Sequence, residues 1–304
     1  MDMIKNLVEN YPESNKTQHL DLVLESGAAN GSYHIGCLLY IKELERKNKL
    51  KIDRISGSSI GAIAGLYYLT DTLDDFIEDY KSLRECFKLH LNLNRLKTIL
   101  RDKIKNLSND DFEKVNQKLF IVLHDITQRQ QILKSEFKNR EDLRHSILKS
   151  SHIPYITDET FLYRENDRYY FDGGIPHIFC NRESGEKNIL YINICRVGKI
   201  NGIFSVKKEK NNYGRLIEGA LDAHEFFIYE KPTKFCSYVN NWCMLDYTTL
   251  RLKQLCFKIL FYFVLISHYI GVYVFPYVAN LYIIQLFSPI FLNYYRDFLL
   301  FYCL

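Results

Sequence analysis

The stretch DRISGSSIGAIAG, residues 53–65, brings three glycines and three serines to the point where a strand-like segment passes into a helical one. Within it, Gly57, Ser59 and Gly61 form a G-x-S-x-G pattern. In a sharp strand-to-helix turn, glycines two residues to either side of the serine avoid backbone clashes, and the serine hydroxyl projects at the helix N-terminus. We therefore predict that Ser59 is a nucleophile carried on an elbow formed by Gly57 and Gly61.

Strand-like and helical segments alternate on both sides of this elbow. The apolar patterns predict strands over residues 20–26, 51–56, 118–126, 168–174 and 188–198, and helices over 33–49, 60–70, 73–89, 140–149 and 216–230. No internal repeat is visible, which argues against a solenoid or a propeller. The alternation predicts an α/β fold with a mainly parallel central sheet.

Composition excludes several classes of protein. The 304 residues are 47% hydrophobic and 25% charged, as in an ordinary folded protein, and the net charge of +4 is too small to predict nucleic-acid binding across a whole face. The eight cysteines are scattered without a C-x-x-C pair, so we expect neither a metal site nor a disulfide framework. The N-terminus lacks the apolar run of a signal peptide, and we expect a protein that is not secreted.

A serine nucleophile needs a base, because its hydroxyl is weakly reactive at neutral pH. The segment YYFDGG, residues 169–174, places Asp172 at the end of a predicted strand, followed by Gly173 and Gly174. Partial burial there would raise the pKa of the carboxyl group and make it a better proton acceptor. We predict that Asp172 is the base, with an ordinary Asp-Gly turn as the alternative.

A third small-residue segment precedes the elbow. SGAANG, residues 26–31, follows the first predicted strand and opens a helix, where small side chains let successive backbone N–H groups converge. Acyl transfer needs such donors to stabilise the oxyanion of the tetrahedral intermediate. We predict an oxyanion hole built from Gly27, Ala28, Asn30 and Gly31, with a generic helix-entry loop as the alternative.

In this order, the three motifs resemble those of the patatin-like phospholipases, lipid acyl hydrolases that use a Ser/Asp dyad. SGAANGSYHIG (26–36) is similar to the family's glycine-rich loop, GSSIG (57–61) to its nucleophile elbow and DGG (172–174) to its Asp-Gly motif. SSHIP (150–154) and VLHDITQRQ (122–130) resemble two further family segments. The resemblance covers about residues 21–230 and implies a patatin-like three-layer fold.

The resemblance also implies a chemistry. Ser59 would attack the ester carbonyl of a phospholipid or another glycerolipid, Asp172 would accept the proton, and no metal or cofactor would be needed. A transacylase would use the same acyl-enzyme. The chain departs from the family at Ser26 and Ala28, where glycine is common, and at Asn30, where Arg or Lys is frequent.

The C-terminal region carries a long apolar run. Residues 259–295 contain no Asp, Glu, Lys or Arg, and about 20 apolar residues suffice for a helix to cross a bilayer. Pro276 divides the run, so one span, a hairpin, interfacial helices or a buried helix pair all remain open. The basic residues before it, Arg251, Lys253 and Lys258, favour a cytosolic position for the preceding domain.

These observations give a domain organisation. We predict an N-terminal extension over residues 1–19, a patatin-like catalytic domain over 20–232, and a C-terminal region over 233–304 whose apolar segment 259–295 associates with membranes. We expect a lipid substrate and a membrane surface as partners, no nucleic acid, and an oligomeric state that the sequence leaves open.

Two other functions compete with the dyad hydrolase. A Ser/His/Asp hydrolase would use Ser59 and Asp172 with His177 or His224, in the chain order that α/β-hydrolases require. A membrane-anchored interaction protein would keep the fold with weak or no turnover, which the altered residues of the 26–31 loop favour.

Overall fold

The computed structural model describes residues 2–12, 17–90, 92–158, 160–180, 187–195, 212–270 and 273. Its strands are β1 (Gln18–Leu24), β2 (Leu50–Gly57), β3 (Leu119–Asp125), β4 (Gln130–Lys134), β5 (Tyr163–Glu165), β6 (Arg168–Phe171), β7 (Asn188–Ile192) and β8 (Cys236–Tyr238). The α-helices are α1 (Asp2–Glu9), α2 (Gly31–Arg46), α3 (Ile60–Leu69), α4 (Leu73–His90), α5 (Arg95–Lys105), α6 (Asn109–Lys118), α7 (Arg140–Ser150), α9 (Tyr213–Tyr229) and α10 (Met244–Tyr269).

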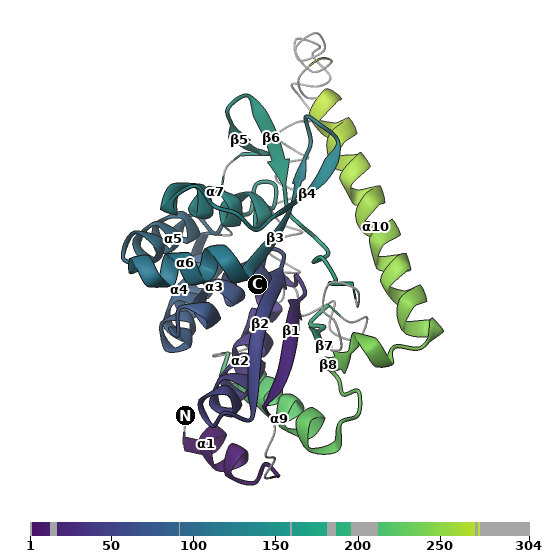
Figure 1. Ribbon diagram of the computed structural model, residues 1–304. Helices are drawn as coiled ribbons and strands as arrows, with labels where there is room; N and C mark the ends of the chain where they lie inside the picture. Colours follow the sequence, from purple (N-terminus) through teal and green to yellow (C-terminus); the bar gives the residue numbers. More distant parts are fainter. Residues whose placement is uncertain are drawn as a thin grey trace.

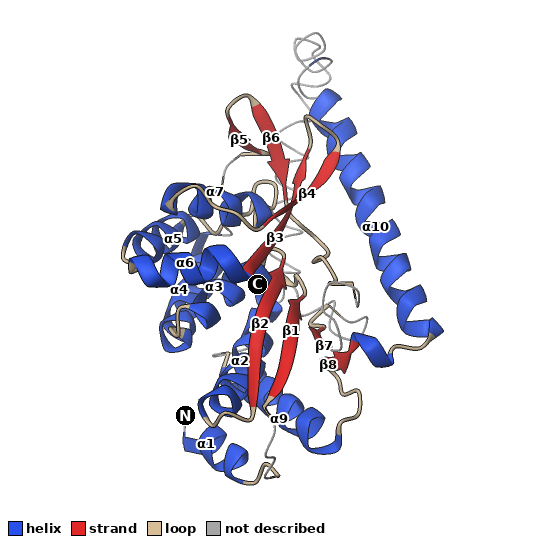
Figure 2. Cartoon of the chain, viewed as in Figure 1, coloured by secondary structure: helices blue, strands red, loops and turns tan. Residues whose placement is uncertain are grey.

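One mixed sheet organises these elements. Its described strands run in the order β5-β6-β3-β2-β1-β7-β8, with β4 paired to β3 outside this path. The central pairs β1/β2, β1/β7 and β2/β3 are parallel, whereas β4, β5, β6 and β8 join antiparallel. Helices flank the sheet, with α3 to α7 on one side and α10 on the other (Figures 1 and 2). The predicted α/β fold with a mainly parallel centre is therefore confirmed.

Strand β6 lies between β5 and β3 and runs antiparallel to β3. The pairing of β2 with β3 ends where Gly57 faces Ile121, and β3 then continues to Asp125. Along this extension β6 pairs antiparallel, with Phe171 opposite His124. Asp172, the residue after β6, therefore lies near the end of β2, although β2 and β6 run in opposite directions.

The main core lies on one face of the sheet. Alternate residues of β1, namely Leu20, Leu22 and Leu24, are buried in the large cluster that α2, α3 and α9 complete, and Val23 packs into a smaller cluster on the other face. Helices α2 and α9 approach closely because Gly36 lies against the backbone of Leu216. The period of two in β1 is that of a strand buried on both faces.

The last described helix, α10, contains the beginning of the predicted apolar segment. Residues 259–270 and 273 of that segment belong to the described part of the chain, and the rest of 259–295 lies outside it. Among the described helices, none combines the length and the apolar character that crossing a membrane requires. The single span, hairpin, interfacial helices and buried helix pair considered for residues 259–295 therefore stay predictions.

Candidate active site

The elbow between β2 and α3 has the backbone geometry that its sequence predicts. Ser59 has φ 52° and ψ −126°, which places a residue other than glycine in a strained region at the first turn of α3. A Cβ atom on Gly57 would lie 2.6 Å from the backbone of Gly61, and one on Gly61 would lie 2.4 Å from the carbonyl oxygen of Leu24. Both glycines are therefore required by close backbone approach, and the turn rests directly on the end of β1.

Hydrogen bonds from two other serines hold the elbow. Ser58 donates its hydroxyl to the carbonyl of Gly174 at 2.6 Å, which joins the elbow to the Asp-Gly-Gly segment. Ser150, at the end of α7, accepts the N–H of Ser59 at 3.0 Å and donates to the carbonyl of Val122 at 2.6 Å. Sequence reasoning gave neither serine a role, because each partner is distant in the sequence.

Asp172 follows β6 and lies beside the elbow. Its Oδ1 accepts the N–H of Gly174 at 2.7 Å, while its Oδ2 is buried without a hydrogen-bond partner among the described residues. Burial raises the pKa of Asp172 to about 6, against smaller lowering effects of the Ser59 hydroxyl and the Gly174 N–H. Because Ser58 donates to the carbonyl of Gly174 and Asp172 accepts the N–H of the same residue, the structure places the predicted nucleophile and base on adjoining segments.

Gly173 and Gly174 allow this approach. A Cβ on Gly173 would lie 2.1 Å from the carbonyl oxygen of Val122, so the chain passes directly over β3. Gly174 has φ 61°, and a Cβ there would overlap the ring of Phe257 on α10. The Asp-Gly-Gly motif is therefore fixed between β3 and α10.

In the predicted oxyanion loop, two backbone N–H groups bond within the loop and two do not. Asn30 donates its N–H to the carbonyl of Gly27 at 2.8 Å, and Gly31 donates to that of Ala28. The N–H groups of Gly27 and Ala28 donate to no other group within the described part of the chain. The N–H groups of Asn30 and Gly31 thus bond within the loop, whereas those of Gly27 and Ala28 do not, and the oxyanion hole of these four residues stays a prediction.

Side chains from other helices hold this loop. Tyr80 of α4 donates its hydroxyl to the carbonyl of Ala28 at 3.2 Å. Asn30 is fully buried and donates its side-chain amide to the carbonyl of Ile194 at 2.9 Å, so its side chain also braces the loop. Arg215 of α9 contacts the loop as well, through the carbonyl of Ala29. Composition and spacing gave no indication of these partners.

Ala28→Gly should raise the free energy of unfolding. Ala28 has φ 40°, where a Cβ atom costs about 1 kcal/mol that glycine avoids. The greater freedom of glycine in the unfolded chain offsets part of this gain. Thermal unfolding should show a small increase in Tm with undiminished activity. A lower Tm together with lost activity would show that the Ala28 methyl group supports the loop.

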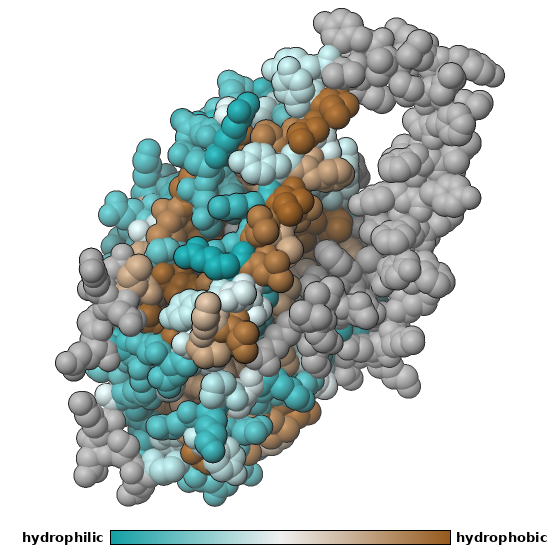
Figure 3. Space-filling view, turned by 90° about the vertical axis from the view of Figure 1, so that its right-hand side faces the viewer, coloured by the Kyte–Doolittle hydropathy of each residue, from teal (hydrophilic) through white to brown (hydrophobic). Residues whose placement is uncertain are grey.

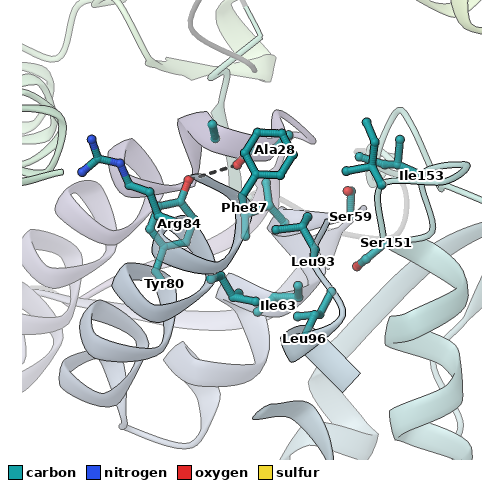
Figure 4. Close-up of a pocket in the computed structure, with 14 residues that line it drawn as sticks. Ala28, Ser59, Ile63, Tyr80, Arg84, Phe87, Leu93, Leu96, Ser151 and Ile153 are labelled. Carbon is teal, nitrogen blue, oxygen red and sulfur yellow. Dashed lines mark hydrogen bonds between the residues drawn. The ribbon is translucent and has the colours of Figure 1, made fainter. Parts of the chain in front are cut away.

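An apolar cavity opens beside Ser59. About 710 Å³ of empty space, measured out to the solvent, lies among residues of the 28–29 loop, α3, α4, α5 and the segment after α7. Ser59 and Ser151 lie at one side of this cavity, across from Tyr80, and the guanidinium of Arg84 points away from it (Figure 4). Apolar side chains line it, among them Ile63, Phe87, Leu93, Leu96 and Ile153. Its apolar lining suits a hydrocarbon chain.

The histidines proposed for a triad contact other groups. His224, on α9, lies 3.0 Å from the hydroxyl of Tyr40, and His177 packs edge-on against the ring of Phe179. A triad requires its carboxylate to hold a histidine, whereas Oδ2 of Asp172 has no hydrogen-bond partner among the described residues. Within the described part of the chain, no three His, Cys, Asp or Glu side chains lie close enough together to hold a metal ion.

Comparison with known proteins shows what residues 22–177 are similar to. A family model described as patatin-like phospholipase matches residues 22–177, about half of the chain, and confirms the resemblance drawn from the motifs. No curated protein matches the chain. Among solved structures, VipD from Legionella pneumophila is similar at 14% identity with a TM-score of 0.29, covering 55% of this chain and 48% of its own. The chain thus spans about half the length of that protein.

Proposed function

Because this chain belongs to the patatin-like phospholipase family, we propose that it is a serine lipid acyl hydrolase that cleaves ester bonds of phospholipids or other glycerolipids. The observation that carries the proposal is the approach of Asp172 to Ser59. A strained nucleophile elbow borders an apolar cavity, and a buried carboxylate of raised pKa lies beside that elbow. Structural serines and aspartates rarely combine these features.

The reaction follows from this geometry. The Oγ of Ser59 attacks the ester carbonyl carbon while Asp172 takes its proton, and the N–H groups of Gly27 and Ala28 stabilise the oxyanion. The tetrahedral intermediate then expels the alcohol, which receives the proton from Asp172. Water, deprotonated by Asp172, attacks the acyl-enzyme, and Asp172 then returns the proton to the Oγ of Ser59 as the fatty acid leaves. The acyl chain occupies the cavity lined by Ile63 and Leu96.

Another donor is available on the elbow itself. Ile60 occupies the first position of α3, where helix N–H groups have no partner within the helix and the helix dipole favours negative charge. The residue after a serine nucleophile commonly donates to the oxyanion. We therefore include the Ile60 N–H in the proposed oxyanion hole.

Acyl release from a panel of lipids tests the proposal. The panel contains phosphatidylcholine, phosphatidylethanolamine, phosphatidylglycerol and triacylglycerol, and free fatty acid is the product measured. We expect release from at least one lipid and labelling of Ser59 by a fluorophosphonate probe. A folded protein that releases no acid and takes no label would contradict the proposal and favour a binding protein of the same fold.

The rate should depend on pH through Asp172. Its carboxyl group must be ionised to accept a proton, and its pKa is about 6. Activity is therefore expected to be low below pH 5, half-maximal near pH 6, and constant from pH 7 upward until another group titrates. The measurement is kcat/KM against pH with a soluble ester. A midpoint near 4, typical of an exposed carboxylate, would contradict the burial of this group.

We further propose that the outer face of α10 lies on the lipid surface. Large apolar side chains recur there at intervals of three and four residues and remain exposed: Leu252, Leu255, Ile259, Phe263, Ile266 and Ile270. Figure 3 shows apolar side chains gathered on the side of the molecule where α10 lies. The inner face of α10 is apolar too, with Phe261 and Val264 buried. A row of exposed apolar side chains on a helix whose other face packs on protein is typical of an interaction surface.

Vesicle sedimentation tests this surface. Burial of each large apolar side chain contributes about 1.5–3 kcal/mol, so the double variant Ile259→Ser/Phe263→Ser should sediment with phosphatidylcholine vesicles at least ~10-fold less than the parent. The matched control Ile217→Ser/Leu221→Ser changes two exposed apolar residues of α9 and should sediment normally. If the α10 variant and the parent sediment equally, α10 is not the docking surface.

A further inference from the structure

Two cationic side chains that lie outside residues 22–177, the part matched by the family model, contact the two ends of the loop at residues 26–31. Lys253 of α10 donates to Oε1 of Glu25 at 2.7 Å and to Oδ1 of Asn193 at 3.1 Å. Glu25 is 2% exposed and directly precedes the loop. At the other end, Arg215 of α9 donates to the carbonyl of Ala29 and to Oδ1 of Asn30, both at 2.8 Å.

The end of β1 is held from several directions. The N–H of Glu25 donates to the carbonyl of Ile192, and its own carbonyl accepts from Nε2 of His34 at 2.7 Å. Burial lowers the pKa of His34 to about 4, so this imidazole is neutral and donates through Nε2. The backbone of Glu25 is therefore fixed by the sheet and α2. Its carboxylate accepts the N–H of Cys195 at 3.3 Å, and Lys253 links the same carboxylate to α10.

We infer that Lys253 and Arg215 are positioning residues that fix the oxyanion loop for catalysis, so that the catalytic unit extends to α9 and α10. The inference rests on the proposed hydrolase function. Neither cation touches the reacting atoms. Each acts through residues on either side of Gly27 and Ala28, whose N–H groups are the proposed oxyanion donors.

Energetics favour a positioning role over a purely stabilising one. Glu25 is 2% exposed and Lys253 22% exposed, so their attraction returns about what their lost hydration costs and adds little to stability; we assign the pair the role of selecting one arrangement of the loop. The loop needs such specification because Ala28 has φ 40° and would relax if it were released. Oxyanion donors act only when held in place before the reaction, and a displacement of about 1 Å can cost ~100-fold in rate.

Steady-state kinetics with a water-soluble 4-nitrophenyl ester test the inference in the full chain. Lys253→Met and Arg215→Met remove the charge and keep most of the side-chain length. Each should lower kcat by roughly 10- to 100-fold with KM changed less than about twofold, because the donors act in the transition state. Lys253→Arg and Arg215→Lys keep the charge and should recover most of the rate. Lys258→Met, an exposed lysine of α10, is the matched control and should leave kcat unchanged.

The outcomes separate this inference from the proposed function. If the parent neither hydrolyses the ester nor takes a fluorophosphonate label, the proposed function itself fails. If the parent reacts and the folded Met variants react equally fast, or if their KM rises with kcat unchanged, the inference is overturned. Should the Met variants not fold, Glu25→Gln decides in the same way, because it keeps the side-chain shape and removes the ion pair.

Discussion

Ser59→Ala is expected to abolish hydrolysis, with a fall in kcat of about 10³-fold or more. No acyl-enzyme can form without the hydroxyl, and what remains is the catalysis that the oxyanion donors give to direct attack by water. The variant should fold, because alanine occupies the same backbone position and Ser59 makes its structural hydrogen bond through the backbone N–H. The measurement is acyl release from the best lipid of the panel, together with loss of fluorophosphonate labelling.

Ser58→Ala is the matched control, since it removes the neighbouring hydroxyl from the same elbow. Ser58 donates to Gly174, so its loss should lower the free energy of unfolding by about 1 kcal/mol and reduce activity less than about tenfold. Labelling must persist in this variant. If Ser59→Ala retains labelling and Ser58→Ala loses it, the nucleophile has been assigned to the wrong serine.

The elbow could be predicted from sequence because its determinants are local. Gly57 and Gly61 are required by atoms of the same turn and of the strand end beside it, and a strand followed by a helix is visible in the apolar pattern. The same holds for the loop at residues 26–31, which lies between β1 and α2. In both places the motif lies within a few adjacent residues and could be recognised from the sequence, although partners farther along the chain also hold the loop.

The direction of β6 could not be predicted in this way. Its apolar pattern marks a strand, but strand direction depends on which neighbour it pairs with, and that neighbour, β3, is distant in the sequence. Asp172 nevertheless reaches Ser59, because β3 extends beyond β2 and guides β6 back. The Asp-Gly-Gly motif thus predicts the proximity correctly without predicting the strand that produces it.

The long-range hydrogen bonds that hold the site could not be predicted, for a related reason. Ser150, Arg215 and Lys253 are separated from their partners by 91, 186 and 228 residues, and nothing in their surrounding sequence marks them. Lys253 was interpreted as one of three basic residues before an apolar segment, whereas in the structure it bonds Glu25. The side chain of Asn30, too, donates to Ile194, which lies outside its own loop.

Asp172→Asn should lower kcat by about 10²- to 10⁴-fold, the usual contribution of a general base. The amide cannot accept the proton of Ser59, but its oxygen can still accept the N–H of Gly174, so the loop should keep its shape. The residual activity should no longer fall near pH 6, since the titrating group is gone. A residual rate that still falls near pH 6 would assign that step to another group.

The same variant should be more stable than the parent at neutral pH. Burial raises the pKa of Asp172 from 3.8 to about 6, so the folded protein binds a proton that the unfolded chain releases more readily. For the parent, this makes stability fall as pH rises from about 4 to about 6, by up to roughly 3 kcal/mol. Asparagine has no such ionisation. The Tm of Asp172→Asn should therefore match that of the parent at pH 4 and exceed it at pH 8, because at the higher pH the parent must keep a buried carboxylate ionised, as its proposed role as base requires.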